Sequence, residues 1–336
     1  MDAIVCLQPG QLEYTDAPKA QLTKGNTLVS ARRVGICGTD LHAIEGRQPY
    51  FNYPRILGHE LAVEIIASDD PSLIPGSNAT ILPYFNCGIC SACKKGLSNC
   101  CADLKVFGVH IDGGLRKNFS VPSPRVIPNG MLSPDQLALV EPFAIGAHAI
   151  RRADARAGEI ILVAGAGPIG LAVCSFIQLA GAIPILIDVD QHRLDFAKSV
   201  FGIGNTVAAG SDAIARVRDL TKGNMPDTVI DATGNLAAIN GMFQFMSQGG
   251  KYVLVGLQKG DISFSHPEFH RREATLMSSR NATLEDFRKV IGAFEDGSLA
   301  GEKMITHRMS FENAKEEIPL LADRKHLAVK GIVEMD

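Results

Sequence analysis

Five of the chain's eight cysteines stand between positions 87 and 101, and their spacing indicates metal binding. Cys87, Cys90, Cys93 and Cys101 follow one another at x2, x2 and x7 intervals. Four thiolates from one short lobe bind a tetrahedral zinc ion with no open position, which is typical of a structural site. The spacing leaves open whether Cys100 replaces Cys101 as the fourth ligand. The plainer alternative is a chance group of buried cysteines.

A second group of possible ligands is spread over three short segments. Its members are Cys37 in GICGTDLH, His59 and Glu60 in GHE, and Glu141 in EPF. A thiolate, an imidazole and a carboxylate around zinc leave one position for a substrate, as a catalytic site requires. Each residue also has a plainer explanation: Cys37 as a small core residue, His59 as a buried histidine and Glu141 as an acid at a helix start.

The segment GAGPIG at 165–170 predicts a nucleotide site, because an apolar strand precedes it and an apolar helical stretch follows. Gly165 permits a tight turn, Gly167 lets the backbone approach a pyrophosphate, and Gly170 lets helix and strand pack closely. Asp188 ends the next apolar run and can accept hydrogen bonds from both ribose hydroxyls. Its charge would repel a 2′-phosphate, which favours NAD over NADP. The alternative is a glycine-rich turn with Asp188 as a helix cap.

The elements that must position these residues fall into two regions with different sequence patterns. Together the two regions predict an α/β fold class. The first 145 or so residues are rich in glycine and proline and carry short β-type runs, which predict a compact, loop-rich β domain. From about residue 158, strand runs alternate with helical stretches, which predicts a parallel sheet covered on both faces. The strands expected there are 160–164, 184–187, 228–232 and 252–256, with helices at 169–180 and 284–295 and a last strand at 329–335.

The bulk composition excludes several classes of protein. The 336 residues are 46% hydrophobic and 21% charged, enough for a large core, and the formal net charge is −3 without long runs of one sign. A basic footprint for nucleic acid is therefore absent. The apolar runs are far shorter than the ~20 residues that span a bilayer. The start, MDAIVCLQPG, does not have the pattern of a signal peptide, so we expect a cytoplasmic protein.

The chain resembles the medium-chain zinc dehydrogenases over essentially its whole length. It carries motifs in the order seen in that family: GICGTDLH, GHE, the four-cysteine lobe, EPF and GAGPIG. The resemblance implies a GroES-like catalytic domain at residues 1–145 and 284–336, with a structural zinc lobe at about 84–103. It implies a Rossmann NAD-binding domain at 146–283. It also implies two zinc ions per subunit, NAD as cofactor, Cys101 as the fourth lobe ligand, and a homodimer or homotetramer.

The resemblance also implies roles around the second metal site. Zinc would be bound by Cys37 and His59, with Glu60 or Glu141 as the carboxylate near or on the metal. The Thr39 hydroxyl would hydrogen-bond the substrate oxygen, and His42 would pass a proton to solvent. Asp40 would orient His59. The cofactor is expected to contact Gly165, Gly167, Pro168, Ile169, Gly170, Asp188, Arg193, Thr233, Val255 and Gly256.

The substrate is less closely defined. Glu141 stands where liver-type alcohol dehydrogenases have a cysteine, so the chain resembles the polyol and threonine dehydrogenase branch. Four short segments most resemble bacterial sugar-acid dehydrogenases, which oxidise C5 of hexonates such as L-galactonate or L-gulonate. These segments are YPRILGHE, GVHIDGG, HPEFH and SRNAT. Arg280, or else His110 or Lys259, would then meet the substrate carboxylate, unless Arg280 binds Glu141 or the cofactor. A polyol or L-threonine substrate is one alternative, and an NAD(H)-binding regulator with decayed catalysis is another.

Overall fold

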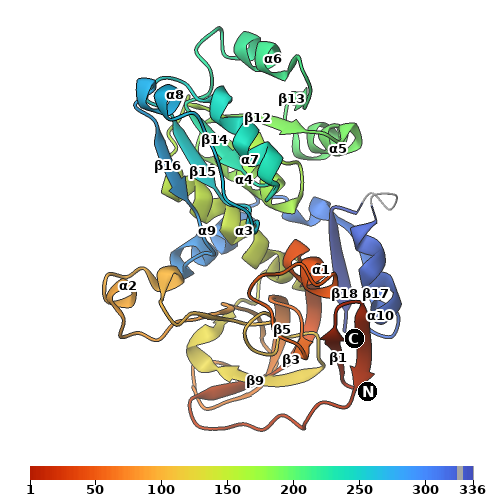
Figure 1. Cartoon of the computed structure of the whole chain (residues 1–336). Coiled ribbons are helices and arrows are strands. Elements are labelled where there is room, and N and C mark those ends of the chain that lie inside the picture. The colour runs from red at the N-terminus through yellow and green to blue at the C-terminus, as the bar shows by residue number, and fades with distance from the viewer. Residues whose placement is uncertain (324–327, 336) are drawn as a thin grey trace. The chain divides into compact units, whose positions relative to one another are not determined.

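The computed structural model describes residues 1–323 and 328–335, and the chain forms two compact units (Figure 1). The first unit contains Met1–Glu141 and Thr283–Asp336, and the second contains Pro142–Ala282. These boundaries lie within a few residues of the ones expected at 145 and 283. No helix in the described part of the chain is both long and apolar enough to cross a bilayer.

The first unit is built mainly of β-strands. Its largest sheet has seven strands in the order β10-β6-β5-β3-β18-β17, with β9 also paired to β3; β2-β1-β4 and β7-β8 form two smaller sheets. The strands are Ala3–Gln8 (β1), Gln11–Thr15 (β2), Asn26–Ile36 (β3), Arg55–Ile56 (β4), Glu60–Ser68 (β5), Asn78–Ile81 (β6), Tyr84–Phe85 (β7), Lys105–Val106 (β8), Asn118–Pro122 (β9), Val126–Pro128 (β10), Ile305–Ser310 (β17) and Lys330–Glu334 (β18).

The helices of the first unit are short, apart from the two that lie next to the unit boundary. Helix α3 begins in this unit and continues into the second, with Pro142 inside it. The helices and helical turns are Gly38–Ile44 (α1), Ser91–Lys94 (α2), Ser98–Cys100 (η1), Ser123–Arg125 (η2), Pro134–Ala153 (α3), Leu284–Glu295 (α9), Gly301–Met304 (η4), Ala314–Glu317 (α10) and Ile318–Ala322 (η5).

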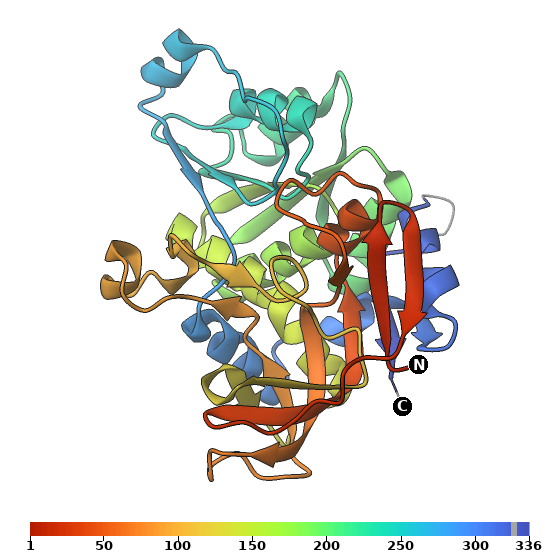
Figure 2. The same ribbon diagram turned by 60° about the horizontal axis from the view of Figure 1, so that its bottom comes forward.

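The last strand, β18, lies in the middle of the large sheet rather than at its edge. It runs antiparallel to β3, with Ile332 opposite Gly35 and Val333 opposite Val34, and parallel to β17 on its other side. Figure 2 shows this C-terminal segment, in blue, against the N-terminal part of the chain, in red. Val34 and Val333 are fully buried in one apolar cluster. The first unit is therefore complete only when the end of the chain has joined it.

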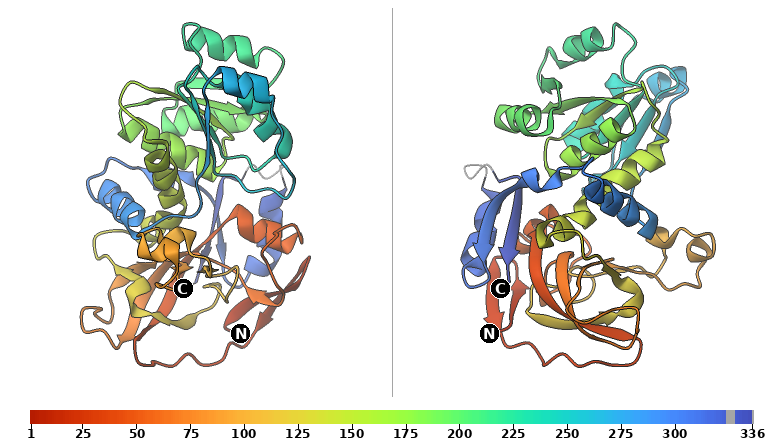
Figure 3. Two further views of the ribbon diagram at one scale, coloured as in Figure 1. Left: turned by 60° about the vertical axis from the view of Figure 1, so that its left-hand side comes forward. Right: turned by 180° about the vertical axis from the view of Figure 1, so that it is seen from behind.

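The second unit is a single parallel sheet with helices along both of its faces (Figure 3). The strand order β13-β12-β11-β14-β15-β16 is the doubly wound order of a Rossmann fold. Its strands are Ile160–Ala164 (β11), Ile183–Asp188 (β12), Asn205–Ala208 (β13), Thr228–Asp231 (β14), Lys251–Leu254 (β15) and Thr275–Ser278 (β16). Its helices and one helical turn are Pro168–Leu179 (α4), Gln191–Phe201 (α5), Ala213–Leu220 (α6), Leu236–Met242 (α7), Phe243–Phe245 (η3) and His266–Arg271 (α8).

Local sequence signals explain where the helices of this unit begin and end. Helix α4 starts at Pro168, whose ring has the φ angle of a first helical residue and whose missing N–H costs nothing there. The Asp190 side chain caps α5 by accepting from the backbone N–H groups of His192 and Arg193. Gly202 ends α5 in a left-handed conformation, with φ of 66°.

Candidate metal and cofactor sites

The four-cysteine lobe brings together the cysteines that the spacing singled out. Cys87, Cys90, Cys93 and Cys101 each offer a sulfur, and these four atoms lie within 4.8 Å of one another. Backbone geometry contributes to the cluster, because the N–H of Cys87 donates to Cys101 Sγ at 3.2 Å and that of Cys90 to Cys87 Sγ at 3.4 Å. Cys100 is exposed and lies outside the group. All eight cysteines of the chain are free thiols.

Polar groups around the lobe donate hydrogen bonds to its sulfurs. Asn86 Nδ2 donates to Cys93 Sγ at 3.4 Å, while Asn86 Oδ1 accepts from Arg125 at 2.8 Å. The backbone N–H of Ala102, followed by that of Cys93, lowers the pKa of Cys90 to about 6. A thiol that ionises this readily is a good zinc ligand.

The second cluster joins the start of helix α1 to the start of strand β5. Cys37 precedes α1, His59 immediately precedes β5 and Glu60 is the first residue of β5. One ligand atom from each of the three lies within 4.8 Å of the others. Gly35 stands opposite Glu60 in the β3–β5 ladder, and a Cβ at Gly35 would lie 2.1 Å from Glu60 Oε2. The glycine therefore leaves the space that the carboxylate occupies.

Asp40 connects the two segments that carry the ligands. Its Oδ2 accepts the backbone N–H of Cys37 at 2.9 Å, which closes the first turn of α1. Its Oδ1 accepts from Gly58 N at 3.4 Å and lies 3.7 Å from Nδ1 of His59. Burial raises the pKa of the Asp40 carboxyl, so its interactions compensate a real desolvation cost.

Glu141 is the other carboxylate expected at this cluster, and a different element, helix α3, positions it. It is buried in the middle of α3, so the interpretation of Glu141 as an acid at a helix start is wrong. Pro142 does not start a helix here but lies within one. The buried hydroxyl of Tyr84 donates to Glu141 Oε1. Burial raises the pKa of Glu141 and, together with the adjacent carboxylate, raises that of Tyr84 well above its ordinary value.

Lys330 is a residue of this site that the sequence analysis missed. Its Nζ donates to Oε1 and Oε2 of Glu60 at 2.6 and 2.7 Å and to the carbonyl of Ile36 at 3.2 Å. Burial opposes its charge, but Glu60 and Cys37 outweigh this and raise the pKa of Lys330. A lysine inside the apolar run of the last strand was a usable signal, but its partner could not be read from the sequence.

The donor set fits a zinc ion. Cys37 offers a sulfur and Glu60 a carboxylate, while His59 is 5% exposed and its Nδ1 makes no hydrogen bond in the described part of the chain. Asp40, Glu60 and Glu141 are all buried carboxyl groups, and a divalent cation would compensate their charge. Sulfur, imidazole and carboxylate are ligands that zinc prefers.

The expected catalytic residues of α1 lie beside this cluster in sequence. Thr39 is half-buried in the first turn, while His42 is exposed in the last turn. Partial desolvation, followed by the charge of Arg47, lowers the pKa of His42. Arg280 belongs to the second unit, where it is exposed just after β16, and Lys259 is exposed in the loop after β15.

His110 lies on a loop that packs against the turn before His59. A Cβ at Gly108 would come within 2.9 Å of Gly58 N, so the loop backbone touches the residue preceding His59. His110 Nδ1 accepts the backbone N–H of Val106 at 3.1 Å, which makes Nε2 the protonated nitrogen of the neutral ring. The imidazole stacks on Tyr50 with ring centroids 6.4 Å apart.

The glycine-rich turn of the second unit has the geometry that a pyrophosphate needs. Gly165 has φ of 102°, and a Cβ on Gly170 would lie 1.7 Å from the Gly165 carbonyl oxygen. A Cβ on Gly167 would meet only Arg193 Nη1, at 3.8 Å. The half-buried Pro168 and Ile169 open α4 behind this turn. The backbone is thus open at Gly167, next to a helix N-terminus and a guanidinium.

The carboxylates at the ends of two strands organise the neighbouring loops. Asp188 Oδ2 accepts from Ala166 N at 2.6 Å, which places the acid directly beside the glycine turn. Asp231, which sequence reasoning did not identify, accepts from both the N–H and the hydroxyl of Thr233. Its carbonyl accepts from Val255 N and Gly256 N, both at 3.0 Å. Asp231 therefore ties together the loops that carry three of the expected cofactor residues.

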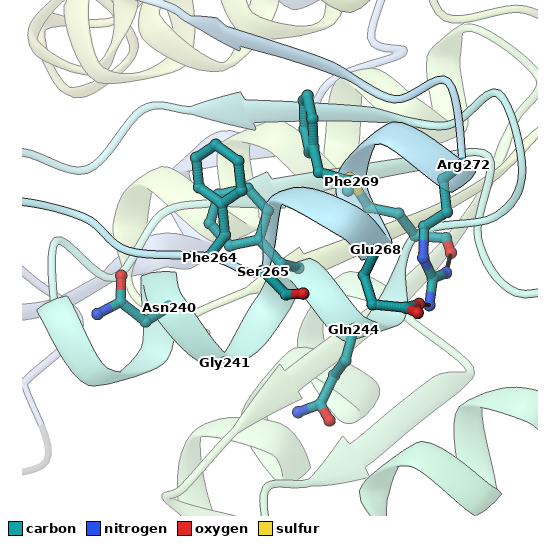
Figure 4. Close-up of a pocket in the computed structure, with 10 residues that line it drawn as sticks. Asn240, Gly241, Gln244, Phe264, Ser265, Glu268, Phe269 and Arg272 are labelled. Carbon is teal, nitrogen blue, oxygen red and sulfur yellow. Dashed lines mark hydrogen bonds and ion pairs between the residues drawn. The ribbon is translucent and has the colours of Figure 1, made fainter.

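A separate pocket of the second unit lies between α7 and α8 (Figure 4). Phe264 and Phe269 form its apolar side, while Glu268 and Arg272 lie at its polar end. Phe243, which stacks on Phe264, also lines the pocket. It shares no residue with the expected cofactor or substrate sites.

Comparisons with known proteins agree with this arrangement. Residues 23–131 match the alcohol dehydrogenase GroES-like domain family, and residues 168–296 match the zinc-binding dehydrogenase family. The chain is 39% identical to L-galactonate-5-dehydrogenase of Escherichia coli K12 over 335 residues, which cover 99% of this chain and 98% of that protein.

Solved structures extend the likeness to the whole fold. A short chain alcohol dehydrogenase from Escherichia coli CFT073, complexed with NADH, has a TM-score of 0.92 at 27% identity and covers 100% of this chain and 99% of its own. L-Idonate 5-dehydrogenase from Escherichia coli K-12 has a TM-score of 0.91 at 25% identity, with 99% and 98% covered. The chain belongs to the zinc-type medium-chain alcohol dehydrogenases. It is a dehydrogenase of polyols or sugar acids, with zinc and NAD as cofactors.

Proposed function

We propose that this enzyme oxidises the C5 hydroxyl of a hexonate, such as L-gulonate or L-galactonate, to a ketone and transfers the hydride to NAD. The observation that carries the proposal is the similarity to L-galactonate-5-dehydrogenase over nearly the full length of both chains. The structural likeness to L-idonate 5-dehydrogenase supports the same position of oxidation on a related acid. A neutral polyol or L-threonine is the alternative substrate.

Cys37 and His59 would hold the catalytic zinc ion, together with the carboxylate of Glu60 or Glu141. When bound, zinc supplies Lewis-acid chemistry that lowers the pKa of the substrate alcohol. Asp40 fixes both ligand segments through its hydrogen bonds to Cys37 and Gly58. A second zinc ion would occupy the lobe of Cys87, Cys90, Cys93 and Cys101 and stabilise its fold, because that ligand set leaves no open position.

Residues of α1 would move the proton that the alcohol loses. The Thr39 hydroxyl, two residues after Cys37, would accept a hydrogen bond from the substrate hydroxyl and orient it. His42 would take the proton onward to solvent. Its lowered pKa favours the neutral imidazole, and only the neutral ring can accept a proton.

The second unit would bind NAD across the glycine turn. The N-terminal backbone of α4 and Arg193 would meet the pyrophosphate, and Asp188 would accept hydrogen bonds from the adenosine ribose. Thr233, Val255 and Gly256 would line the site from the loops that Asp231 holds. We further propose a cytoplasmic homodimer or homotetramer, which light scattering of the purified enzyme tests.

The substrate carboxylate would be bound by Arg280, with His110 and Lys259 as the next candidates. A guanidinium matches a carboxylate with two parallel hydrogen bonds. His110 presents Nε2 as a donor, because Nδ1 accepts from Val106.

Losing one partner of a desolvated charge pair costs ~2–5 kcal/mol, so Arg280→Ala should lower kcat/KM strongly for a hexonate. A neutral polyol of equal length should lose much less; an equal loss on both substrates would assign Arg280 to the cofactor or to Glu141.

Steady-state kinetics on a panel of hexonates, polyols and L-threonine, each with NAD, tests the proposed substrate class. We expect the highest kcat/KM on a hexonate with a free C5 hydroxyl. Preference for neutral polyols over every aldonate would reject the sugar-acid assignment while leaving the zinc dehydrogenase intact. NADH binding without turnover of any substrate would instead favour an NAD(H)-binding regulator with decayed catalysis.

A further inference from the structure

Lys330 stands out among the cations of this protein. In the part of the chain that the structure describes, it is the only buried lysine or arginine, with 2% of its surface exposed. An ammonium group has three protons to donate, and Lys330 has three acceptors: both oxygens of Glu60 and the carbonyl of Ile36. The three protons of the ammonium group therefore have three acceptors, two of them on Glu60.

Glu60 is held on two sides by this arrangement. Lys330 binds both of its oxygens, and Gly35 on the facing strand leaves just enough room for Oε2, as the 2.1 Å approach of a Cβ there shows. A Glu60 oxygen nevertheless lies within 4.8 Å of ligand atoms of Cys37 and His59. The carboxylate is thus within reach of a metal ion at those residues, while an ammonium binds the same lone pairs.

We propose that Lys330 is a positioning residue that restrains the Glu60 carboxylate, so that Cys37, His59 and a single carboxylate oxygen hold the zinc ion and a fourth coordination position stays available to the substrate. This inference rests on the zinc site proposed above for Cys37 and His59. Catalytic zinc sites differ from structural ones in keeping such a position. The ammonium competes with the ion for Glu60, and its positive charge also weakens cation binding nearby.

The position of Lys330 in the chain gives this restraint a structural consequence. Lys330 begins β18, and Glu60 begins β5, 270 positions earlier in the sequence. Both strands pair with β3, which brings the lysine under the metal cluster. The availability of the fourth coordination position would therefore depend on a strand that is distant in sequence from the ligands.

The test compares zinc release and cobalt spectra of the whole enzyme and its Lys330→Met variant. Release of zinc to a chelator should be about tenfold slower in the variant, because both Glu60 oxygens are then free to bind the ion. Outer partners of metal ligands change affinity by ~10–100-fold. The visible absorption of the Co²⁺-substituted enzyme should change, since its ligand set changes. Cys37→Ser enzyme loaded in the same way gives the spectrum of the four-cysteine lobe alone, for subtraction.

A second substitution isolates Glu60 as the cause. In the double variant Glu60→Gln, Lys330→Met there is no carboxylate at position 60, so zinc release should lose the slowing seen in Lys330→Met. Lys330→Gln retains a donor but not the charge, and it should slow release in the same direction by a smaller factor. This variant serves for the measurement if the methionine variant does not fold.

The outcomes separate this inference from the proposed function. Unchanged or faster zinc release in Lys330→Met and Lys330→Gln, with a cobalt spectrum like that of the wild type, would overturn the restraint and leave a purely structural ion pair. A wild-type enzyme without any Cys37-dependent metal would instead overturn the proposed zinc site. A slower release that persists in the double variant would also overturn the inference, since Glu60 could not be its cause.

Discussion

The two clusters of possible zinc ligands lie in the same unit and are built in opposite ways. The four-cysteine lobe takes its sulfurs from positions 87 to 101, and backbone N–H groups of the same segment donate to them. The other cluster takes Cys37 from the start of α1, His59 from the turn before β5 and Glu60 from β5, and Glu60 is bound by Lys330 in β18. Cys87 is exposed, whereas His59, Glu60 and Lys330 are buried.

The difference teaches where each site obtains its stability. A local lobe with little apolar core relies on its metal, and binding free energy is then folding free energy. The buried cluster is already held by the sheet, by Asp40 and by the Glu60–Lys330 ion pair. We therefore expect loss of a ligand to affect mainly structure in the lobe and mainly activity in the buried cluster.

The largest expected effect is that of Cys37→Ser. Removing the thiolate should abolish turnover, because Lewis-acid stabilisation of the transition state is worth several kcal/mol. Each ~1.4 kcal/mol is tenfold in rate, so we expect kcat to fall by at least ~10³-fold. Thermal unfolding should change little, since the sheet positions this segment. Steady-state kinetics and calorimetry measure the two quantities. A large drop in melting temperature would contradict the comparison.

Cys90→Ser tests the lobe. Structural zinc binding is worth on the order of 10 kcal/mol in small zinc domains, so the lobe should unfold locally and zinc content should fall from two ions per subunit to one. Elemental analysis and proteolysis within 86–104 measure this. Cys100→Ser is the matched control, because Cys100 is exposed and outside the cluster, and we expect it to behave like the wild type. A normal zinc content in Cys90→Ser would refute the assignment.

Asp188→Ala extends the comparison to the other locally built site. The substitution should weaken NAD binding by ~1.5–3 kcal/mol, the contribution of hydrogen bonds to a charged group. The preference for NAD over NADP should therefore fall roughly tenfold or more. Zinc content should stay at the wild-type value. The ratio of kcat/KM for the two cofactors is the measurement. A wild-type enzyme that uses both cofactors equally well would show that Asp188 does not select NAD.

Tyr84→Phe should have the smallest effect and sharpens the role of Glu141. It removes the hydroxyl that donates to Glu141 Oε1, and an under-satisfied buried acceptor costs ~1–3 kcal/mol. If Glu141 is a zinc ligand, the variant should also release catalytic zinc several-fold faster. If only the melting temperature falls and zinc release is unchanged, Glu141 supports the site without binding the ion.

Much of the fold was predictable because its signals are local. The strand at 160–164 and the helix at 284–295 were predicted at the bounds that the structure has, since one is a short apolar run and the other has a clear amphipathic period. The misjudged position of Glu141 has the same origin. Proline commonly marks a helix start, but Pro142 lies inside α3. The true start at Pro134 had its own local signal, because Ser133 and Gln136 form a capping box there.

The sequence by itself determined the kinds of chemistry: a thiolate lobe, a glycine turn with an acid after the next strand, and a thiolate–imidazole–carboxylate set. These follow from residue types and short spacings, which fix geometry over one or two turns of chain. Only the tertiary structure decided that Lys330 binds Glu60, that Tyr84 binds Glu141 and that Asp231 joins two loops. Pairing between distant strands made the first and the third of these contacts, whereas the second joins strand β7 to helix α3. A side chain's partner across a sheet is set by register rather than by its neighbours in sequence.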